Sequence, residues 1–196
     1  MGTAVALNDV KERRRISAER AIIGRDKSMI AYCNPENKVI GSHYTATKDL
    51  DIKEVAARIR ADIKTAVKTG MLPQGIKASV RISRYSMGQS IDVSIVAFPS
   101  LVLRKEYCLA TNFGADLWSD EAVAEREKGR FTKQAEDALE VVSKIHGAYN
   151  YNNCDSMSDY VSIKYNGGVS ICSSLNEVAK QRYKLEQAIS SGLRDE

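Results

Sequence analysis

Apolar residues repeat with two different periods in the middle of the chain. Over residues 52–69 they recur every three or four positions, which is the period of one face of an α-helix. Over residues 76–84 and 90–98 they alternate with polar residues, which is the period of a β-strand with one buried face. Residues 85–89, between the two strands, have the length and composition of a hairpin loop. The pattern therefore predicts a compact unit of one helix and two antiparallel strands.

Signals for both ends of this helix flank its apolar residues. Asp49 and Asp51 lie before the first of them, where a short acidic side chain accepts hydrogen bonds from free backbone N–H groups and complements the helix dipole. Gly70 and Pro73 follow the last one, and both residue types end helices. The apolar face that we expect in the core consists of Ile52, Val55, Ala56, Ile59, Ile63, Ala66 and Val67.

Weaker patterns extend the same architecture on both sides. Residues 119–145 predict a second long helix with Gly129 as its weak point, and residues 174–191 predict a third. Residues 28–44 predict a further hairpin, and residues 160–172 predict another around an Asn-Gly-Gly turn. The chain is therefore predicted to have an α+β fold, with antiparallel β hairpins packed against two or three amphipathic helices.

The N-terminal region differs in composition from the rest of the chain. Residues 1–28 are strongly basic, with Arg13, Arg14 and Arg15 in succession, and their apolar periodicity is poor. Residues 29–196 are predicted to form a single α+β domain. For the basic region two interpretations stay open. It is either a peripheral arm or an arm that neutralises phosphates and releases their counterions.

Charge is distributed unevenly along the 196 residues. The whole chain has a formal net charge of +4. Residues 1–100 carry 17 Lys and Arg against 10 Asp and Glu, a net +7, whereas residues 101–196 carry 12 against 15, a net −3. A basic half favours binding to polyanions. The same sign argues against a mimic of DNA, because a mimic must be acidic.

The basic residues of the central unit form a candidate binding surface. Arg60, Lys64 and Lys68 recur at helical spacing on the polar side of the predicted helix. Arg81 and Arg84 lie on the first predicted strand. Two interpretations stay open for these cations, a solvated face or a contact with an acidic partner. The full set of candidate partner-binding or nucleic-acid-binding residues is Arg13, Arg14, Arg15, Arg60, Lys64, Lys68, Arg81 and Arg84.

Sequence motifs for catalysis and for cofactors are missing. The chain has no nucleophile elbow, no glycine-rich phosphate loop and no HExxH sequence, so we expect a protein that is not an enzyme and needs no cofactor or metal. Four cysteines without a CxxC pair, and only two histidines, argue against a structural zinc site. Residues 150–159 form either a turn rich in Asn and Asp or a cation site with Asp155 and Asp159, although they do not match the calcium-loop pattern.

The chain is expected to be cytoplasmic and not to enter a membrane. No run of about 18 apolar residues is present. The N-terminus lacks the charged and then apolar pattern of a secretory signal. In that compartment we expect the cysteines to stay free thiols.

Three stretches of the chain carry a family resemblance. They are VAARIRADIK, KASVRISRYSMGQSIDVSIV and AYNYNNCDSMSDYVSIKYNGGVSI. The region from about Thr45 to Cys172 resembles one of the large polyvalent-protein-associated domains of phage and conjugative-element proteins. The resemblance implies an α+β fold and the biology of a mobile genetic element, and it supplies no catalytic motif that can be carried over to this chain. Several proteins of this kind look like devices that protect incoming DNA against restriction or CRISPR systems.

The resemblance and the charge pattern together lead to one main hypothesis. The protein is a non-enzymatic phage or mobile-element accessory protein that binds and inhibits a host defence protein or nucleoprotein complex, of the anti-CRISPR or anti-restriction type. The alternative is a direct nucleic-acid-binding protein that places its basic face on the phosphates of DNA or RNA. A homodimeric structural module is the third hypothesis.

Overall fold

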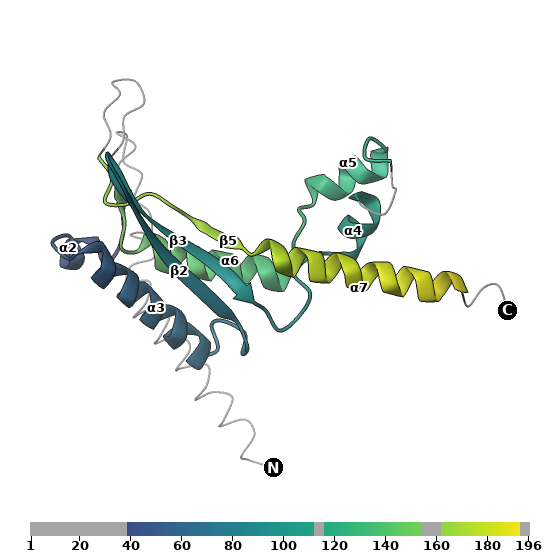
Figure 1. Ribbon diagram of the computed structural model, residues 1–196, viewed down its shortest axis with the longest axis horizontal. Helices are drawn as coiled ribbons and strands as arrows, with labels where there is room; N and C mark the ends of the chain where they lie inside the picture. The colour runs from purple at the N-terminus through teal and green to yellow at the C-terminus, as the bar shows by residue number, and fades with distance from the viewer. Residues whose placement is uncertain (1–38, 112–115, 154–161, 193–196) are drawn as a thin grey trace, which may run out of the picture.

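The computed structural model describes residues 39–111, 116–153 and 162–192 (Figure 1), and it confirms the predicted α+β fold. In chain order the elements are β1 (Val39–Ile40), α2 (Tyr44–Thr47), α3 (Ile52–Lys68), β2 (Lys77–Tyr85), β3 (Gly88–Ala97), α4 (Lys105–Thr111), α5 (Asp120–Glu127), α6 (Lys133–Gly147), β4 (Tyr151–Asn152), β5 (Val169–Ile171) and α7 (Ser173–Gly192). The predicted basic arm, residues 1–28 with Arg13, Arg14 and Arg15, lies outside the described residues. Within the described ranges, no helix combines the length and the apolar composition that crossing a membrane requires.

The central sheet contains three strands in the order β2-β3-β5. β2 and β3 form the predicted antiparallel hairpin, with Val80 opposite Val93, and the turn between them is tighter than the loop predicted from the sequence. β5 runs parallel to β3 on the other side, with Ile171 opposite Ile95. β2 is therefore an edge strand of this sheet, and β3 is its central strand.

One face of this sheet forms the hydrophobic core with α3 and α6. α3 packs mainly against β2, α6 packs against β5, and the two helices contact each other (Figure 1). Alternate side chains of a strand point to opposite faces, so every second strand residue enters the core. Fully buried members of this core include Ile52, Ile59, Ile91, Ile95 and Ile145. The opposite face carries polar residues such as Ser94 and Ser170, whose hydroxyl oxygens lie 3.2 Å apart.

The long helix predicted over residues 119–145 is two helices, α5 and α6. The chain turns between them at Gly129, whose φ of +84° lies in the left-handed region that favours glycine. Thr132 then caps α6, because its hydroxyl accepts a hydrogen bond from the backbone N–H of Ala135. Gly129, the predicted weak point, thus lies in the break between the two helices.

In both regions where the sequence predicts an outer hairpin, the strand that the structure describes pairs with a distant part of the chain. Val169–Ile171 pairs in parallel with β3, so the antiparallel hairpin predicted over residues 160–172 is wrong. Val39–Ile40, in the other region, pairs antiparallel with Tyr151–Asn152, and the residues before 39 lie outside the described part. The proposed cation ligands Asp155 and Asp159 also lie outside it.

Gly167 explains why the Asn-Gly-Gly sequence does not make a hairpin. The backbone N–H of Ile91 donates to the carbonyl of Asn166, and that of Val93 donates to the carbonyl of Gly168, both at 2.9 Å. Gly167, between these two residues, has a φ of +105°, and a Cβ there would lie 2.2 Å from the carbonyl oxygen of Ile91. Glycine is therefore required for a close approach to β3.

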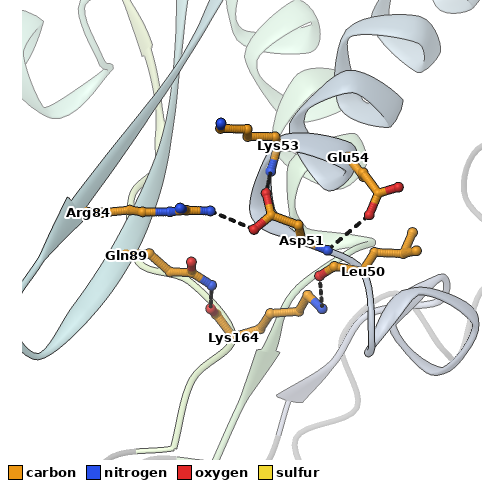
Figure 2. A network of polar contacts seen from close by, with 7 residues as sticks. All are labelled: Leu50, Asp51, Lys53, Glu54, Arg84, Gln89 and Lys164. Atoms are coloured by element: carbon orange, nitrogen blue, oxygen red, sulfur yellow. Dashed lines mark hydrogen bonds and ion pairs between the residues drawn. The ribbon is translucent and has the colours of Figure 1, made fainter.

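The N-terminus of α3 is fixed by Asp51 (Figure 2). Its carboxylate accepts a hydrogen bond of 2.8 Å from the backbone N–H of Lys53, and the carboxylate of Glu54 accepts one of 3.1 Å from the backbone N–H of Asp51. This reciprocal arrangement is a capping box. The second carboxylate oxygen of Asp51 lies 2.6 Å from the guanidinium of Arg84 on β2. The Lys53 N–H and the Arg84 guanidinium hold the pKa of Asp51 below its ordinary value.

His146 is a polar side chain buried in the core. Its Nε2 donates a hydrogen bond of 2.9 Å to the carbonyl of Ile91, and its ring meets the ring of Tyr165 edge-on at 5.1 Å. The hydroxyl of Tyr165 in turn donates to the backbone carbonyl of His146. Burial lowers the pKa of His146, and it outweighs the Ile91 carbonyl and the Asp92 carboxylate, which raise it.

We expect Asp51→Ala to destabilise the protein more than Arg84→Ala does. The first variant loses the cap of α3 together with the ion pair, whereas the second loses only an ion pair between two half-exposed side chains. Thermal unfolding followed by circular dichroism compares the two, and Lys53→Ala, which keeps its backbone N–H, is the control. A greater loss of stability in Arg84→Ala would contradict this account of the helix end.

We expect the free energy of unfolding to fall as the pH is lowered from 7 to 5. The unfolded chain protonates residue 146 near the ordinary pKa of about 6.5, whereas the buried imidazole resists protonation. The stability that the neutral imidazole confers is therefore complete above the unfolded pKa. It is lost toward the lower folded pKa at up to about 1.4 kcal/mol per pH unit. Urea unfolding at a series of pH values measures this slope.

Variants of the two histidines of the chain show which side chain causes the dependence of the free energy of unfolding on pH. His146→Gln should flatten it, because the side chain no longer titrates. His43→Gln is the matched control and should leave the slope intact. A slope that disappears in His43→Gln but persists in His146→Gln would place the effect at the other histidine.

Candidate functional site

A groove lies between α3 and the edge strand β2, and we call it the α3–β2 groove. Its volume is about 500 Å³, within the range of ligand-binding clefts. Its floor is apolar, its rim is basic, and no acidic residue is among the described residues that line it. The floor consists of Ile63, Val67, Ile76, Ala78 and Val80, and the rim consists of Arg60, Lys64, Lys68 and Lys77.

Helical spacing places three of the predicted binding residues on this rim. Arg60, Lys64 and Lys68 follow one another at intervals of four residues, so their side chains lie above one another along one side of α3. Ile63 and Val67 are their immediate neighbours in the sequence and belong to the adjoining apolar side. The groove therefore follows the border between the polar and the apolar faces of the helix.

Arg60 joins the two walls of the groove. Its guanidinium Nη2 donates a hydrogen bond of 2.6 Å to the backbone carbonyl of Val80. The bond crosses from the helix to the edge strand, so it holds α3 against β2. It also fixes the position of this cation of the rim in the free protein.

The three lysines of the rim carry charge that no described residue balances. Lys64, Lys68 and Lys77 are exposed, and none of them forms an ion pair with another described residue. Exposed like charges gathered at one site attract an anionic partner and speed its association. The apolar floor beneath them offers a surface on which apolar groups of such a partner can pack.

The two predicted cations of the strand lie away from the groove. Val80 enters the core, so the neighbouring side chain of Arg81 points to the opposite, polar face of the sheet, where it lies across from Asp92 of β3. Arg84 is bound by Asp51 at the start of α3 (Figure 2). The structure therefore gathers the three helical cations and separates the two strand cations from them.

Sequence analysis missed Lys77 as a member of the site, and it missed the apolar floor. The helical period assigns Val67 to the core, but this side chain is only partly buried and lines the groove. A usable signal was the short connection between Lys68, where α3 ends, and Lys77, where β2 begins. Elements joined so closely usually lie beside each other, so their facing ends contribute to one surface.

A second hollow of about 400 Å³ lies at the tip of the β2–β3 hairpin. Its polar groups are engaged within the protein. The ammonium of Lys164 donates to the carbonyls of Thr47 and Lys48 at 2.8 and 2.6 Å, and burial lowers its pKa. The amide of Asn166 donates to the hydroxyl of Tyr85 at 2.5 Å. These bonds tie the segment before β5 to the end of α2 and to the hairpin, which is a structural role.

The site is characterised by its geometry and by a comparison with known proteins. In the described part of the chain, no group of three or more His, Cys, Asp or Glu side chains is arranged to hold a metal ion. The site thus consists of a basic rim, an apolar floor and the edge of a sheet. Searches of family models, curated proteins and solved structures find no match to this chain.

Proposed function

We propose that this protein is a non-enzymatic accessory protein of a phage or another mobile genetic element. It acts in the cytoplasm, where it binds a host defence nucleoprotein complex of the CRISPR or restriction type and inhibits it. The α3–β2 groove is its contact surface. The observation that supports this proposal is the basic rim above an apolar floor in a single groove. The class of partner comes from the family resemblance.

The groove suits an acidic protein surface better than a bare phosphate backbone. Phosphates would engage the cations of the rim, but they would leave the apolar floor without a partner. An acidic protein segment can use both parts of the groove. Complementary charge then governs the rate of association and the choice of partner, and burial of the apolar floor contributes affinity.

Direct binding of DNA or RNA is the second candidate function. The unbalanced charges of Lys64, Lys68 and Lys77 favour it, because each phosphate that a cation neutralises releases counterions. The described residues that line the groove include no aromatic side chain, so stacking with single-stranded bases has no platform there. Four phosphate contacts with a duplex would give a slope of about −3.6 for the logarithm of the binding constant against that of the salt concentration.

Capture and protection assays test the proposed function together. The tagged protein captures partners from host lysates with and without nuclease, and we expect a subunit of a defence complex to survive the nuclease. The protein is then expressed in strains with defined CRISPR or restriction systems, where we expect a targeted phage to plate more efficiently in at least one strain.

Two outcomes would count against this function. If every captured protein is lost with nuclease, and duplex DNA binds with the steep salt slope given above, the nucleic-acid function replaces it. If no defence subunit is captured and plating rises in no strain, the inhibitor function is wrong.

We expect Lys64→Glu/Lys68→Glu to weaken binding of the captured partner by at least about tenfold. Each reversal replaces attraction at the rim by repulsion, and a tenfold loss needs only about 1.4 kcal/mol in total. Lys48→Glu/Lys184→Glu is the matched control, because it changes the net charge equally at exposed lysines that do not line the groove. Biolayer interferometry measures both variants. Equal losses in the two would mean that only net charge matters.

A further inference from the structure

The outer edge of β2 presents backbone groups that the sheet does not use. On β3, the N–H groups of Ile91 and Val93 point toward the segment of β5. Successive residues of a strand direct their backbone groups to opposite sides, so Asp92 and Ser94 face β2. Their ladder partners on β2 include Ser79 and Arg81. The alternate residues of β2, whose backbone groups point outward, are Ala78, Val80 and Ile82.

Arg60 protects only part of this edge. Its guanidinium takes the carbonyl of Val80, and no other hydrogen bond joins the outward groups of these three residues to a described residue. An exposed edge is a template for pairing with another chain, and proteins commonly guard it with charged side chains. Among the described residues, no group takes the N–H and C=O groups of Ala78 and Ile82 on either side of the guarded carbonyl.

We propose that the groove holds an extended acidic peptide segment of the partner, which adds to the sheet as a strand beside β2. This inference rests on the proposed function, because it uses the same groove, and it specifies how the partner is bound. Main-chain hydrogen bonds at Ala78 and Ile82 anchor the segment. These residues are four positions apart, so a segment of about five residues, at about 3.3 Å per residue, spans them.

The alternation of side chains along a strand determines the composition of this segment. Side chains on the α3 side of the sheet pack on the groove floor beside Ile63 and Val67, so they are apolar. Side chains on the opposite side lie next to Arg81, which alternates with the core residues of β2, so they are acidic. Acidic and apolar residues therefore alternate in the segment, and Arg81 becomes part of the site.

Arg60 exchanges one partner for another in this complex. The added strand approaches the carbonyl of Val80, which the guanidinium occupies in the free protein. The guanidinium then leaves this carbonyl and meets, beside Lys64, an acidic residue of the segment that follows the paired stretch on the α3 side. A charge-assisted hydrogen bond replaces a bond to a neutral carbonyl, so the exchange favours acidic segments over neutral ones.

Two isomeric peptides test the proposal on the full chain. One capped decapeptide alternates glutamate with valine, and the other has all of its glutamates before its valines, so charge and composition are equal. We expect the alternating peptide to bind at least about tenfold more tightly in fluorescence anisotropy at physiological salt, because only its valines all face the floor. We also expect Arg81→Glu to weaken its binding, although Arg81 does not line the groove.

Amide hydrogen exchange followed by NMR locates the bound peptide. The amides of Ala78 and Ile82 should exchange at least about tenfold more slowly in the complex, because they become donors to the added strand. The amides of Ser79 and Arg81 already face β3 and serve as internal controls that change little.

The outcomes separate the mode of binding from the proposed function. Equal binding of the two peptides, no binding of either, or unchanged exchange at Ala78 and Ile82 would each overturn strand addition. In each case the loss of partner binding in Lys64→Glu/Lys68→Glu would leave the proposed function standing. Tighter binding of a single-stranded oligonucleotide of twenty nucleotides, with steep loss in salt, would assign the groove to nucleic acid. Strand addition without any protection of phage would keep the peptide site and remove the inhibitor function.

Discussion

The packing of α3 along the edge strand β2 is the contact on which the rest of the described structure depends. Two polar ties hold it, the Asp51–Arg84 pair at the start of the helix and the bond from Arg60 to the carbonyl of Val80. Between them the apolar face of α3 enters the core. This face extends farther than β2 covers, as the partial exposure of Val67 indicates. The uncovered part of the apolar face becomes the floor of the groove.

Within the part of the chain that the structure describes, the same helix leaves Lys64 and Lys68 without counterions. Its acidic residues are used for other contacts, because Glu54 belongs to the capping box and Asp62 accepts a hydrogen bond from the hydroxyl of Tyr149. Burial of the phenol, and after it this bond to Asp62, raise the pKa of Tyr149. Lys64 and Lys68 follow Asp62 along the helix but form no ion pair with a described residue. The positive rim is therefore a result of how the fold distributes its carboxylates.

Local signals predicted the parts of the fold that form locally. Periodicity, the cap at Asp51 and the stop at Gly70 agree for α3, and its spacing also predicted three cations of the rim. The parallel pairing of β5 with β3 joins residues far apart in the sequence, and the Asn-Gly-Gly sequence favours a hairpin when only its neighbours are considered. The engagement of Arg84 by Asp51 likewise depends on tertiary packing, which no spacing within the strand reveals.

Protection of the exposed edge of β2 explains why Arg60 bonds to the Val80 carbonyl, but it does not explain the other residues of the groove. One guanidinium on the Val80 carbonyl already obstructs pairing at the middle of β2. Lys64 and Lys68 lie on the helix and are not needed for that purpose, and a protein that only had to avoid association has no need to leave Val67 and Ala78 partly exposed beneath them. We therefore propose that the basic rim, the apolar floor and the edge groups of Ala78 and Ile82 together select for an acidic, partly apolar, extended partner. In that binding mode Arg60, which obstructs unspecific pairing in the free protein, also favours a partner of the right charge.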